Sequence, residues 1–174
     1  MTDFENCKIT HYPKKVLAKK AEPIEKIDDS IRRLVEKMAD IMFENKGIGL
    51  AGPQAGIPLR IFITAIDGKR ENLKVYINPT VTCSGKLAAA EEGCLSVPSI
   101  FTKIRRYKQC TVTATDLDGN EFTEEAQGLY ARCLQHEYDH IEGFTIADKL
   151  SPVARIAHRR QLQKLAGETD ESAQ

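Results

Sequence analysis

The chain has 174 residues, a size that fits one ordinary domain with a single core. Apolar residues make up 41% and charged residues 29%, which excludes a disordered chain, and no apolar run approaches the length of a membrane span. The formal net charge is zero, so the composition does not indicate a basic surface for specific DNA binding or for anionic lipid.

The cysteines and the N-terminal residues bear on the cellular compartment. The chain has five cysteines, an odd number, and no pair forms a C-x-x-C motif, so a disulfide framework is not expected. The start, Met1–Cys7, is acidic and has the features of neither a secretory signal nor an organellar transit peptide. The sequence therefore predicts a cytoplasmic protein of bacterial type.

Apolar residues at helical spacing predict a first helix over Ile31–Asn45. A glycine-rich loop, Gly47–Gly56, follows it. The β-branched and aromatic residues of Leu59–Ile66 and Leu73–Ile77 predict two strands. Asn78-Pro79 is typical of a turn and is expected to end the second strand.

The second half of the chain predicts a hairpin and two helices. Lys86–Ser96 is interpreted as a short, irregular extended segment that leads into a loop. The hairpin pairs Cys110–Asp116 with Glu121–Ala126, a second helix covers Leu129–Glu142 before Gly143, and a last helix covers Val153–Leu165 before a frayed tail, Gly167–Gln174. These elements predict a single α+β domain over residues 1–174, with no internal repeat or linker.

The second helix carries the run His136-Glu137-Tyr138-Asp139-His140. Residues four apart lie on one face of a helix, so His136 and His140 can offer two imidazole nitrogens to one metal ion. Glu137 then lies close enough to act as a general base on a metal-bound water, which is the H-E-x-x-H arrangement. The structural alternative is that both histidines belong to the buried stripe of a core helix.

The residues alone leave the third metal ligand open. Ile146 stands where one H-E-x-x-H class has its third histidine, so that class is excluded. Glu142 is too close in sequence, and Glu168 falls in the predicted tail. Cys94 follows a glycine and precedes Ser-x-Pro, a context in which a loop can present a thiolate, although a lone cysteine is more often a small buried apolar residue.

The glycine loop matches G-x-G-x-x-G over Gly47–Gly52. A dinucleotide site needs a strand before these glycines and a helix after them, and here the order is reversed. The match is therefore a false positive. The loop offers instead a backbone that a ligand can approach closely, together with one functional side chain, Gln54.

Three segments in this order resemble those of peptide deformylases. Gly47–Gln54 is similar to that family's G-x-G-L-A-A-x-Q motif, Glu92–Ser96 matches E-G-C-L-S, and Gln135–His140 matches Q-H-E-x-D-H. The resemblance extends from about Ile9 to Ser151. It implies a single α+β domain, with mainly antiparallel strands around a central metal-binding helix and with an N-terminal and a C-terminal helix.

The resemblance also implies a metal centre and a reaction. Cys94, His136 and His140 would bind one divalent ion, most often Fe²⁺ in the cell, with Zn²⁺ or Ni²⁺ as alternatives. Glu137 would be the general base, and the Gln54 side chain and the Leu95 backbone N–H would stabilise negative charge on the formyl oxygen. The reaction would remove the formyl group from N-formylmethionyl peptides of newly made proteins and release formate.

For the substrate, the resemblance implies an extended peptide that lies against the glycine loop and the Cys94 segment. The residues expected to bind it are Ile48, Gly49, Gly93, Leu129 and Cys133. The ribosome is a weaker candidate partner. The last helix bears Arg155, Arg159, Arg160 and Lys164, and a solvated charged face is the simpler interpretation of them.

Two positions depart from the family pattern. Gly52 replaces the usual second alanine of the first motif, and we expect it to loosen the loop that carries Gln54. Phe101 stands where many members have an arginine. The resemblance implies that this position affects the affinity or preference for the substrate residues that follow the methionine. Neither change touches a ligand or Glu137, so we expect an active enzyme. Two alternatives are left open: an H-E-x-x-H metallopeptidase and a catalytically silent binding protein.

Overall fold

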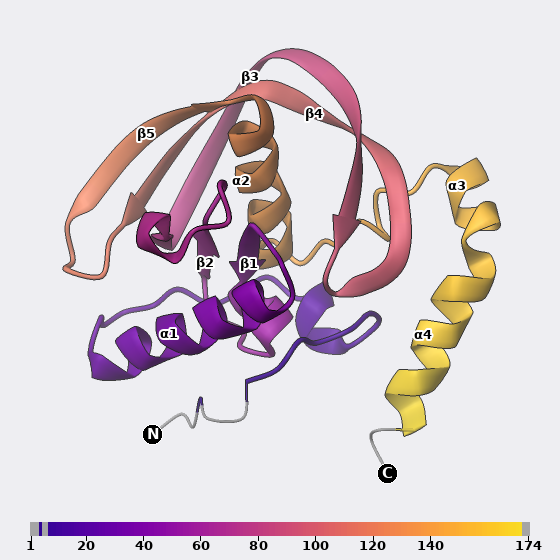
Figure 1. Ribbon diagram of the computed structural model, residues 1–174, viewed down its shortest axis with the longest axis horizontal. Helices are drawn as coiled ribbons and strands as arrows, with labels where there is room; N and C mark the ends of the chain where they lie inside the picture. The colour runs from indigo at the N-terminus through magenta and orange to yellow at the C-terminus, as the bar shows by residue number, and fades with distance from the viewer. Residues whose placement is uncertain (1–3, 5–6, 172–174) are drawn as a thin grey trace.

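The computed structural model describes residue 4 and residues 7–171. One five-stranded sheet organises the fold, with its strands in chain order and each neighbouring pair antiparallel. Its strands are β1 Gly49–Ala51, β2 Ile61–Thr64, β3 Lys74–Cys94, β4 Val97–Thr115 and β5 Glu121–Gln127. The predicted α+β class with mainly antiparallel strands is confirmed, and Figure 1 shows how the sheet curves.

The first long helix, α1 (Asp29–Glu44), begins and ends through local signals. Asp28 is its N-cap and accepts a hydrogen bond from the backbone N–H of Ser30 at 2.9 Å. After Asn45, Lys46 adopts a left-handed conformation with φ of 56°, which turns the chain into the glycine loop. The helix buries an apolar stripe against β1 and β2, formed by Ile31, Leu34, Val35, Met38 and Met42.

The longest elements are β3, with 21 residues, and β4, with 19, which form one antiparallel hairpin. The prediction of a short, irregular segment at Lys86–Ser96 is therefore wrong. The run of Leu, Ala and Glu that begins at Lys86 has weak strand propensity, and pairing with residues 102–107 overrides that propensity. The tip of the hairpin lies between Cys94 and Val97, which are cross-strand neighbours.

The turn predicted at Asn78-Pro79 is a bulge inside β3. The register of β3 against β4 shifts between Ile77 and Thr80, and Asn78 has a φ of 50°. The Asn78 side chain then bonds both backbone groups of Ile24, each at 2.8 Å. The residues typical of a turn thus bend a continuous strand and fasten the N-terminal segment to it.

The helix α2 (Gly128–Ile141) is the centre of the molecule. It contacts all five strands, and Figure 1 shows it inside the curve of the sheet, beneath the β3–β4 hairpin. Gly143 follows its C-terminal end with a φ of 88°, and a Cβ there would lie 2.9 Å from the backbone of Lys19. The predicted central helix is confirmed, with both of its ends within a residue or two of the expected positions.

The C-terminal segment forms two helices where the sequence predicted one. The first, α3 (Pro152–Ala157), is capped by Ser151, whose hydroxyl accepts a hydrogen bond from the Ala154 N–H at 3.1 Å. The second, α4 (Arg159–Glu171), continues past the expected end at Leu165 into the segment predicted as a tail, of which residues 172–174 lie outside the described part of the chain. Among the described residues, no helix is long and apolar enough to cross a membrane.

Candidate active site

Three potential metal ligands converge where the β3–β4 hairpin meets α2. Cys94 lies at the hairpin tip, and His136 and His140 lie one turn apart on α2. The Cys94 Sγ is 3.3 Å from the His140 Nε2, which is 3.2 Å from the His136 Nε2. All three donor atoms lie within 4.8 Å of one another, so the set fits a single divalent ion.

The charge state of Cys94 suits metal binding. Burial by itself raises the pKa of this thiol, but the facing imidazoles of His140 and His136 outweigh burial and hold the pKa well below its ordinary value. The thiolate is the form of cysteine that binds metal ions. A soft thiolate with two imidazoles is a donor set typical of Zn²⁺, Fe²⁺ and other transition-metal ions.

A buried ionic group, here called the Glu92 network, orients His136. The carboxylate of Glu92 lies 3.0 Å from the His136 Nδ1, which leaves Nε2 facing the other two ligands. Arg106 binds the same carboxylate through two hydrogen bonds of 2.6 and 2.9 Å, and Arg132 adds a third of 2.5 Å. Arg106 also reaches Asp139 of α2 at 2.8 Å. The network thus fastens the hairpin to the helix behind the ligands.

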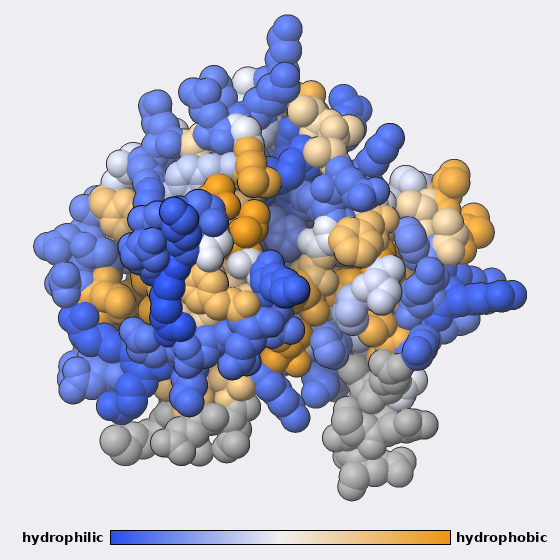
Figure 2. Space-filling model, in the orientation of Figure 1, coloured by the Kyte–Doolittle hydropathy of each residue, from blue (hydrophilic) through white to orange (hydrophobic). Residues whose placement is uncertain are grey.

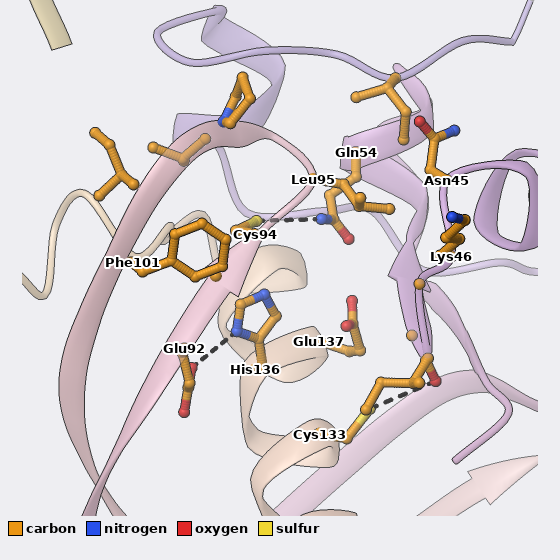
Figure 3. A pocket seen from close by; sticks show the side chains of 18 of the residues that line it. Asn45, Lys46, Gln54, Glu92, Cys94, Leu95, Phe101, Cys133, His136 and Glu137 are labelled. Carbon is orange, nitrogen blue, oxygen red and sulfur yellow. Dashed lines mark hydrogen bonds and ion pairs between the residues drawn. The ribbon is translucent and has the colours of Figure 1, made fainter. Parts of the chain in front are cut away.

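Glu137 lies beside Cys94 and His136 and faces the cavity that these two residues also line (Figure 3). Its side chain is 3% exposed, and among the described residues its Oε2 has no hydrogen-bond partner. Burial raises its pKa to about 7, against the opposing effect of His136 and His140. Gly49 permits this placement, because a Cβ there would collide with the Glu137 carboxylate and lie 2.9 Å from the Cys133 Sγ.

Gln54 reaches the site from the short 3₁₀ helix η2 (Gly52–Ala55). Its Oε1 accepts from the Ala51 N–H at 2.8 Å, so its amide nitrogen points to Cys94, at 3.4 Å from the Sγ. The packing around Gly52 requires a glycine, because a Cβ at that position would lie 2.6 Å from the Leu59 carbonyl oxygen. The expected loosening of the turn stays a prediction.

These residues line a cleft of about 620 Å³ between the hairpin, α2 and the glycine loop. Figure 2 shows a hollow on this face with apolar surface at both sides. Of the residues predicted from the sequence, all but His140 line the cleft, and His140 is fully buried beneath it. The lining residues among them are Ile48, Gly49, Gln54, Gly93, Cys94, Leu95, Leu129, Cys133, His136 and Glu137.

Sequence reasoning assigned no role to several residues at this site. Glu92 belongs to a recognised motif and lies two residues before Cys94 on the same strand, so strand alternation could have placed it beside the site. Arg106 and Arg132 gave no such signal, because their contacts depend on the register of the hairpin against α2. His11 also lines the cleft, from the N-terminal segment, and Lys46 lines it from the position just before the glycine loop.

An α+β domain with a converging thiolate, two imidazoles and an adjacent buried glutamate is typical of metal-dependent hydrolases. The sequence profile described as polypeptide deformylase matches residues 6–155. The peptide deformylase of Thermodesulfovibrio yellowstonii is 40% identical over 157 residues, which cover 89% of this chain and 95% of that relative. The chain belongs to the polypeptide deformylase family, and it is a hydrolase that removes the N-formyl group from nascent peptides.

Solved structures of this family have the same fold. A peptide deformylase of Plasmodium falciparum superposes with a TM-score of 0.91 at 34% identity, over 96% of this chain and 99% of that one. A peptide deformylase of Legionella pneumophila gives a TM-score of 0.87 at 39% identity, over 94% and 97% of the two chains. The single-domain architecture around α2 is therefore that of the family.

Proposed function

We propose that this cleft performs deformylation with Glu137 as the general base and with Cys94, His136 and His140 as the metal ligands. The observation that carries the proposal is the convergence of the three ligand atoms next to a buried carboxylate that lacks a partner among the described residues. A buried polar atom of this kind normally finds a hydrogen-bond partner. The substrate and the attacking water supply that partner during the reaction.

The proposed ion is a single divalent metal, Fe²⁺ in the cell, with Zn²⁺ or Ni²⁺ able to replace it. When bound, it would lower the pKa of a coordinated water and polarise the formyl carbonyl. The donor set of one thiolate and two imidazoles supports this group of ions. Three protein donors are the number that catalytic metal sites of this kind use, so a water or the substrate would supply the remaining ligand.

Glu137 would carry out both proton transfers of the reaction, one from the attacking water and one to the departing amine. A carboxylate with a pKa of about 7 can accept a proton from the attacking water and then return it to the departing amine. Burial is what produces this value, because the charged form loses hydration in the closed wall of the cleft. One residue therefore serves as base for water attack and as acid for amine release, while formate leaves.

Two donors are placed to stabilise charge on the formyl oxygen. The Gln54 amide nitrogen points into the cleft because its oxygen is held by the Ala51 N–H. The backbone N–H of Leu95, the first residue of the hairpin tip, is the second proposed donor. Both lie beside Cys94, so the oxygen would be bound next to the metal ligands.

The methionine side chain and the peptide backbone would occupy the rest of the cleft. Ile48, Leu129 and Cys133 supply an apolar wall beside Glu137, suited to an unbranched thioether side chain. Gly49 and Gly93 let the peptide backbone approach two strands without interference from side chains. The substrate chain would then extend across the cleft as an added strand.

The test is formate release from formyl-Met-Ala-Ser by protein purified without oxygen, because oxidation of the metal or of Cys94 would destroy the site. We expect turnover with one metal ion per chain. Cys94→Ser should lose the metal and the activity, as measured by elemental analysis. Cys83→Ser is the matched control, because Cys83 is also a half-buried free thiol of β3 but does not line the cleft.

Two outcomes would contradict the proposal. Full metal content in Cys94→Ser would exclude Cys94 as a ligand. Cleavage of the Met-Ala bond without release of formate would indicate a metallopeptidase, the main alternative for an H-E-x-x-H site.

The proposed substrate and the cysteines both bear on the cellular compartment in which the protein would act. N-formylmethionyl nascent peptides are the proposed partners, and a reducing cytoplasm suits a thiolate ligand and a protein without a disulfide among its described residues. Contact with the ribosome stays a prediction. Of the basic residues named for it, Arg155 donates to the Ala147 carbonyl at 2.5 Å, so its guanidinium already has a partner within the fold.

A further inference from the structure

Two cysteines that the proposed reaction does not use lie directly opposite each other in the sheet. Cys83 of β3 is the register partner of Cys110 of β4, and neither residue lines the catalytic cleft. Both side chains pack into the same apolar cluster against α2, where the Cys110 thiol donates to the Ala131 carbonyl at 3.6 Å. The two thiols therefore lie side by side on the inner face of the sheet.

The backbone pairing brings these two residues to the separation that a disulfide needs. The Asp116 N–H donates to the Asn120 carbonyl at 2.9 Å, so the backbone groups of Asp116 face β5. Successive residues of a strand face alternate neighbours, and the register of β4 on β5 is constant over Gln109–Thr115, so the backbone groups of Cys110 also face β5. Toward β3, Cys110 therefore forms a non-hydrogen-bonded pair with Cys83. The Cα atoms of such a pair are about 4.5 Å apart, within the roughly 4.4–6.8 Å that a disulfide spans.

A side-chain contact on the other side of β4 supports this alternation. By the same count, Thr113 does not bond toward β5, so Thr113 and Thr123 are a non-hydrogen-bonded pair. Side chains of such pairs approach closely, and the two hydroxyl oxygens are 2.8 Å apart.

The two thiols differ in how a reagent from solvent can reach them. Cys83 is half-buried, whereas Cys110 is only 2% exposed. Burial raises the pKa of both thiols, that of Cys110 to about 12, and at Cys83 the cation Arg106 opposes this increase while Asp139 adds to it. The thiolate is the reactive form of cysteine. A reagent therefore meets Cys83 first, and Cys110 reacts with the group that is then attached to Cys83.

We propose that Cys83 and Cys110 are a redox modification site, at which a small-molecule disulfide such as oxidised glutathione converts the thiol pair into a reversible cross-strand disulfide. The Cys83 thiolate attacks one sulfur of the reagent, forms a mixed disulfide and displaces one molecule of reduced thiol. The Cys110 thiolate then attacks the Cys83 sulfur and displaces the second molecule. The protein loses two electrons and two protons, and the reagent is reduced to two thiols.

The disulfide would join the two arms of the β3–β4 hairpin below the tip that carries Cys94. It closes a loop that runs from Cys83 through the tip to Cys110. A cross-link of this kind restricts the unfolded chain and so stabilises the fold. Because the pair lies outside the cleft, oxidation should leave the site open to substrate. This inference does not depend on the proposed function.

The test incubates the protein, loaded with Zn²⁺, with oxidised glutathione at neutral pH, because Zn²⁺ has no redox chemistry of its own. Remaining thiols are then alkylated without reduction, and the protein is digested with trypsin. The digestion places Cys83 and Cys110 on separate peptides, 75–86 and 109–132, so mass spectrometry detects their cross-link directly.

We expect these two peptides to be joined, with the loss of two hydrogen atoms, and to separate again after reduction. The oxidised protein should unfold at a temperature about 5 °C higher than the reduced protein. Formate release should be unchanged. The matched control exchanges two neighbours, Thr82→Cys with Cys83→Thr, which moves the thiol to the opposite face of β3 and should abolish both the cross-link and the shift in temperature.

Several outcomes would overturn the proposal. Unmodified thiols at both positions, or glutathione attached to Cys83 while Cys110 is still alkylated, would mean that the two cysteines are only small buried side chains. The same conclusion would follow if Cys110 paired with another cysteine, or if the control variant gave the same rise in unfolding temperature. A cross-linked protein that no longer releases formate, although the reduced protein does, would overturn the separation of the pair from the site.

Discussion

Two polar networks contact α2, one buried and one partly exposed, and their difference shows how a site can be distinguished from a structural cluster. The Glu92 network lies behind the proposed metal ligands. The second, here called the Glu124 network, joins Lys74 and Tyr76 of β3, Glu124 of β5 and Tyr130 of α2. In both, one carboxylate accepts hydrogen bonds from several donors on other elements.

The Glu124 network is closed on itself. Glu124 accepts from Lys74 at 2.7 Å and from Tyr76 at 2.6 Å, and it also accepts from Tyr130, whose hydroxyl contacts that of Tyr76. None of these residues lines the catalytic cleft, and none has a buried polar side-chain atom without a partner among the described residues. A satisfied network of this kind fixes the packing of neighbouring elements.

The Glu92 network instead ends at groups that face the cleft. His136 is held through Nδ1 and presents Nε2, and the neighbouring Oε2 of Glu137 has no partner among the described residues. The Glu92 network has more ionic contacts than the Glu124 network, but that number alone does not identify a functional site. What separates them is whether polar atoms are left available for a ligand, which is the feature expected of a functional site.

The largest expected effect is that of Glu137→Gln. The amide cannot accept the proton of the attacking water, so kcat should fall by about 10²–10⁴-fold. Metal content should be unchanged, because the three ligands remain. Thermal stability should not fall, since the change removes a buried carboxylate without a partner. Formate release, elemental analysis and thermal unfolding check the three parts, and unchanged turnover would exclude Glu137 as the base.

A smaller effect on the same site is expected for Glu92→Gln. The amide keeps one acceptor oxygen but loses the negative charge and the second oxygen, so His136, Arg106 and Arg132 can no longer all bond to this side chain. Changes of this kind next to a metal ligand typically lower metal affinity by about 10–100-fold. Competition with a chelator measures the affinity. If it proves equal to that of the unchanged protein, Glu92 has no part in holding His136 for the ion.

The sequence allowed prediction of the half of the site that is local in the chain. His136, Glu137 and His140 lie on one helix, where a spacing of four residues specifies one face whatever the rest of the fold does. The apolar spacing that predicts α2 is equally local. These features could therefore be derived from the residues alone.

The other half of the site could not be derived in this way, because it depends on strand pairing between distant residues. Cys94 reaches α2 through the long β3–β4 hairpin, whose middle has weak strand propensity and whose bulge at Asn78 resembles a turn. The sequence context of Cys94 made it one candidate ligand, and the resemblance of its motif to a known family then assigned the role. Arg106, which joins Glu92 to Asp139, carries no local signal at all.

Glu124→Gln tests the other network, with an effect on stability alone. The amide still accepts hydrogen bonds but loses the charge that pairs with Lys74, so we expect a loss of about 1–2 kcal/mol in the free energy of unfolding. Formate release and metal content should match those of the unchanged protein. A large fall in kcat with normal metal content would show that the Glu124 network is coupled to the site through α2 and would contradict the difference between the two networks.

The smallest effect concerns the difference in stability between the unchanged protein and Glu124→Gln, and how that difference depends on pH. Burial raises the pKa of Glu124, but the hydrogen bonds from Lys74, Tyr130 and Tyr76 outweigh burial and hold the pKa below its ordinary value. A carboxyl group whose pKa is lower in the folded state stabilises the fold above its unfolded pKa of about 4.3, and this stabilisation is lost as the pH falls through the folded value. The stability gap between the unchanged protein and Glu124→Gln should therefore be largest near neutral pH and should shrink below about pH 4.

Urea unfolding of both proteins across this range measures the gap, and the acid sensitivity of the other carboxylates cancels because both proteins share it. A gap that stays constant or widens in acid would mean that the charge of Glu124 contributes nothing, and that its network acts through neutral hydrogen bonds alone.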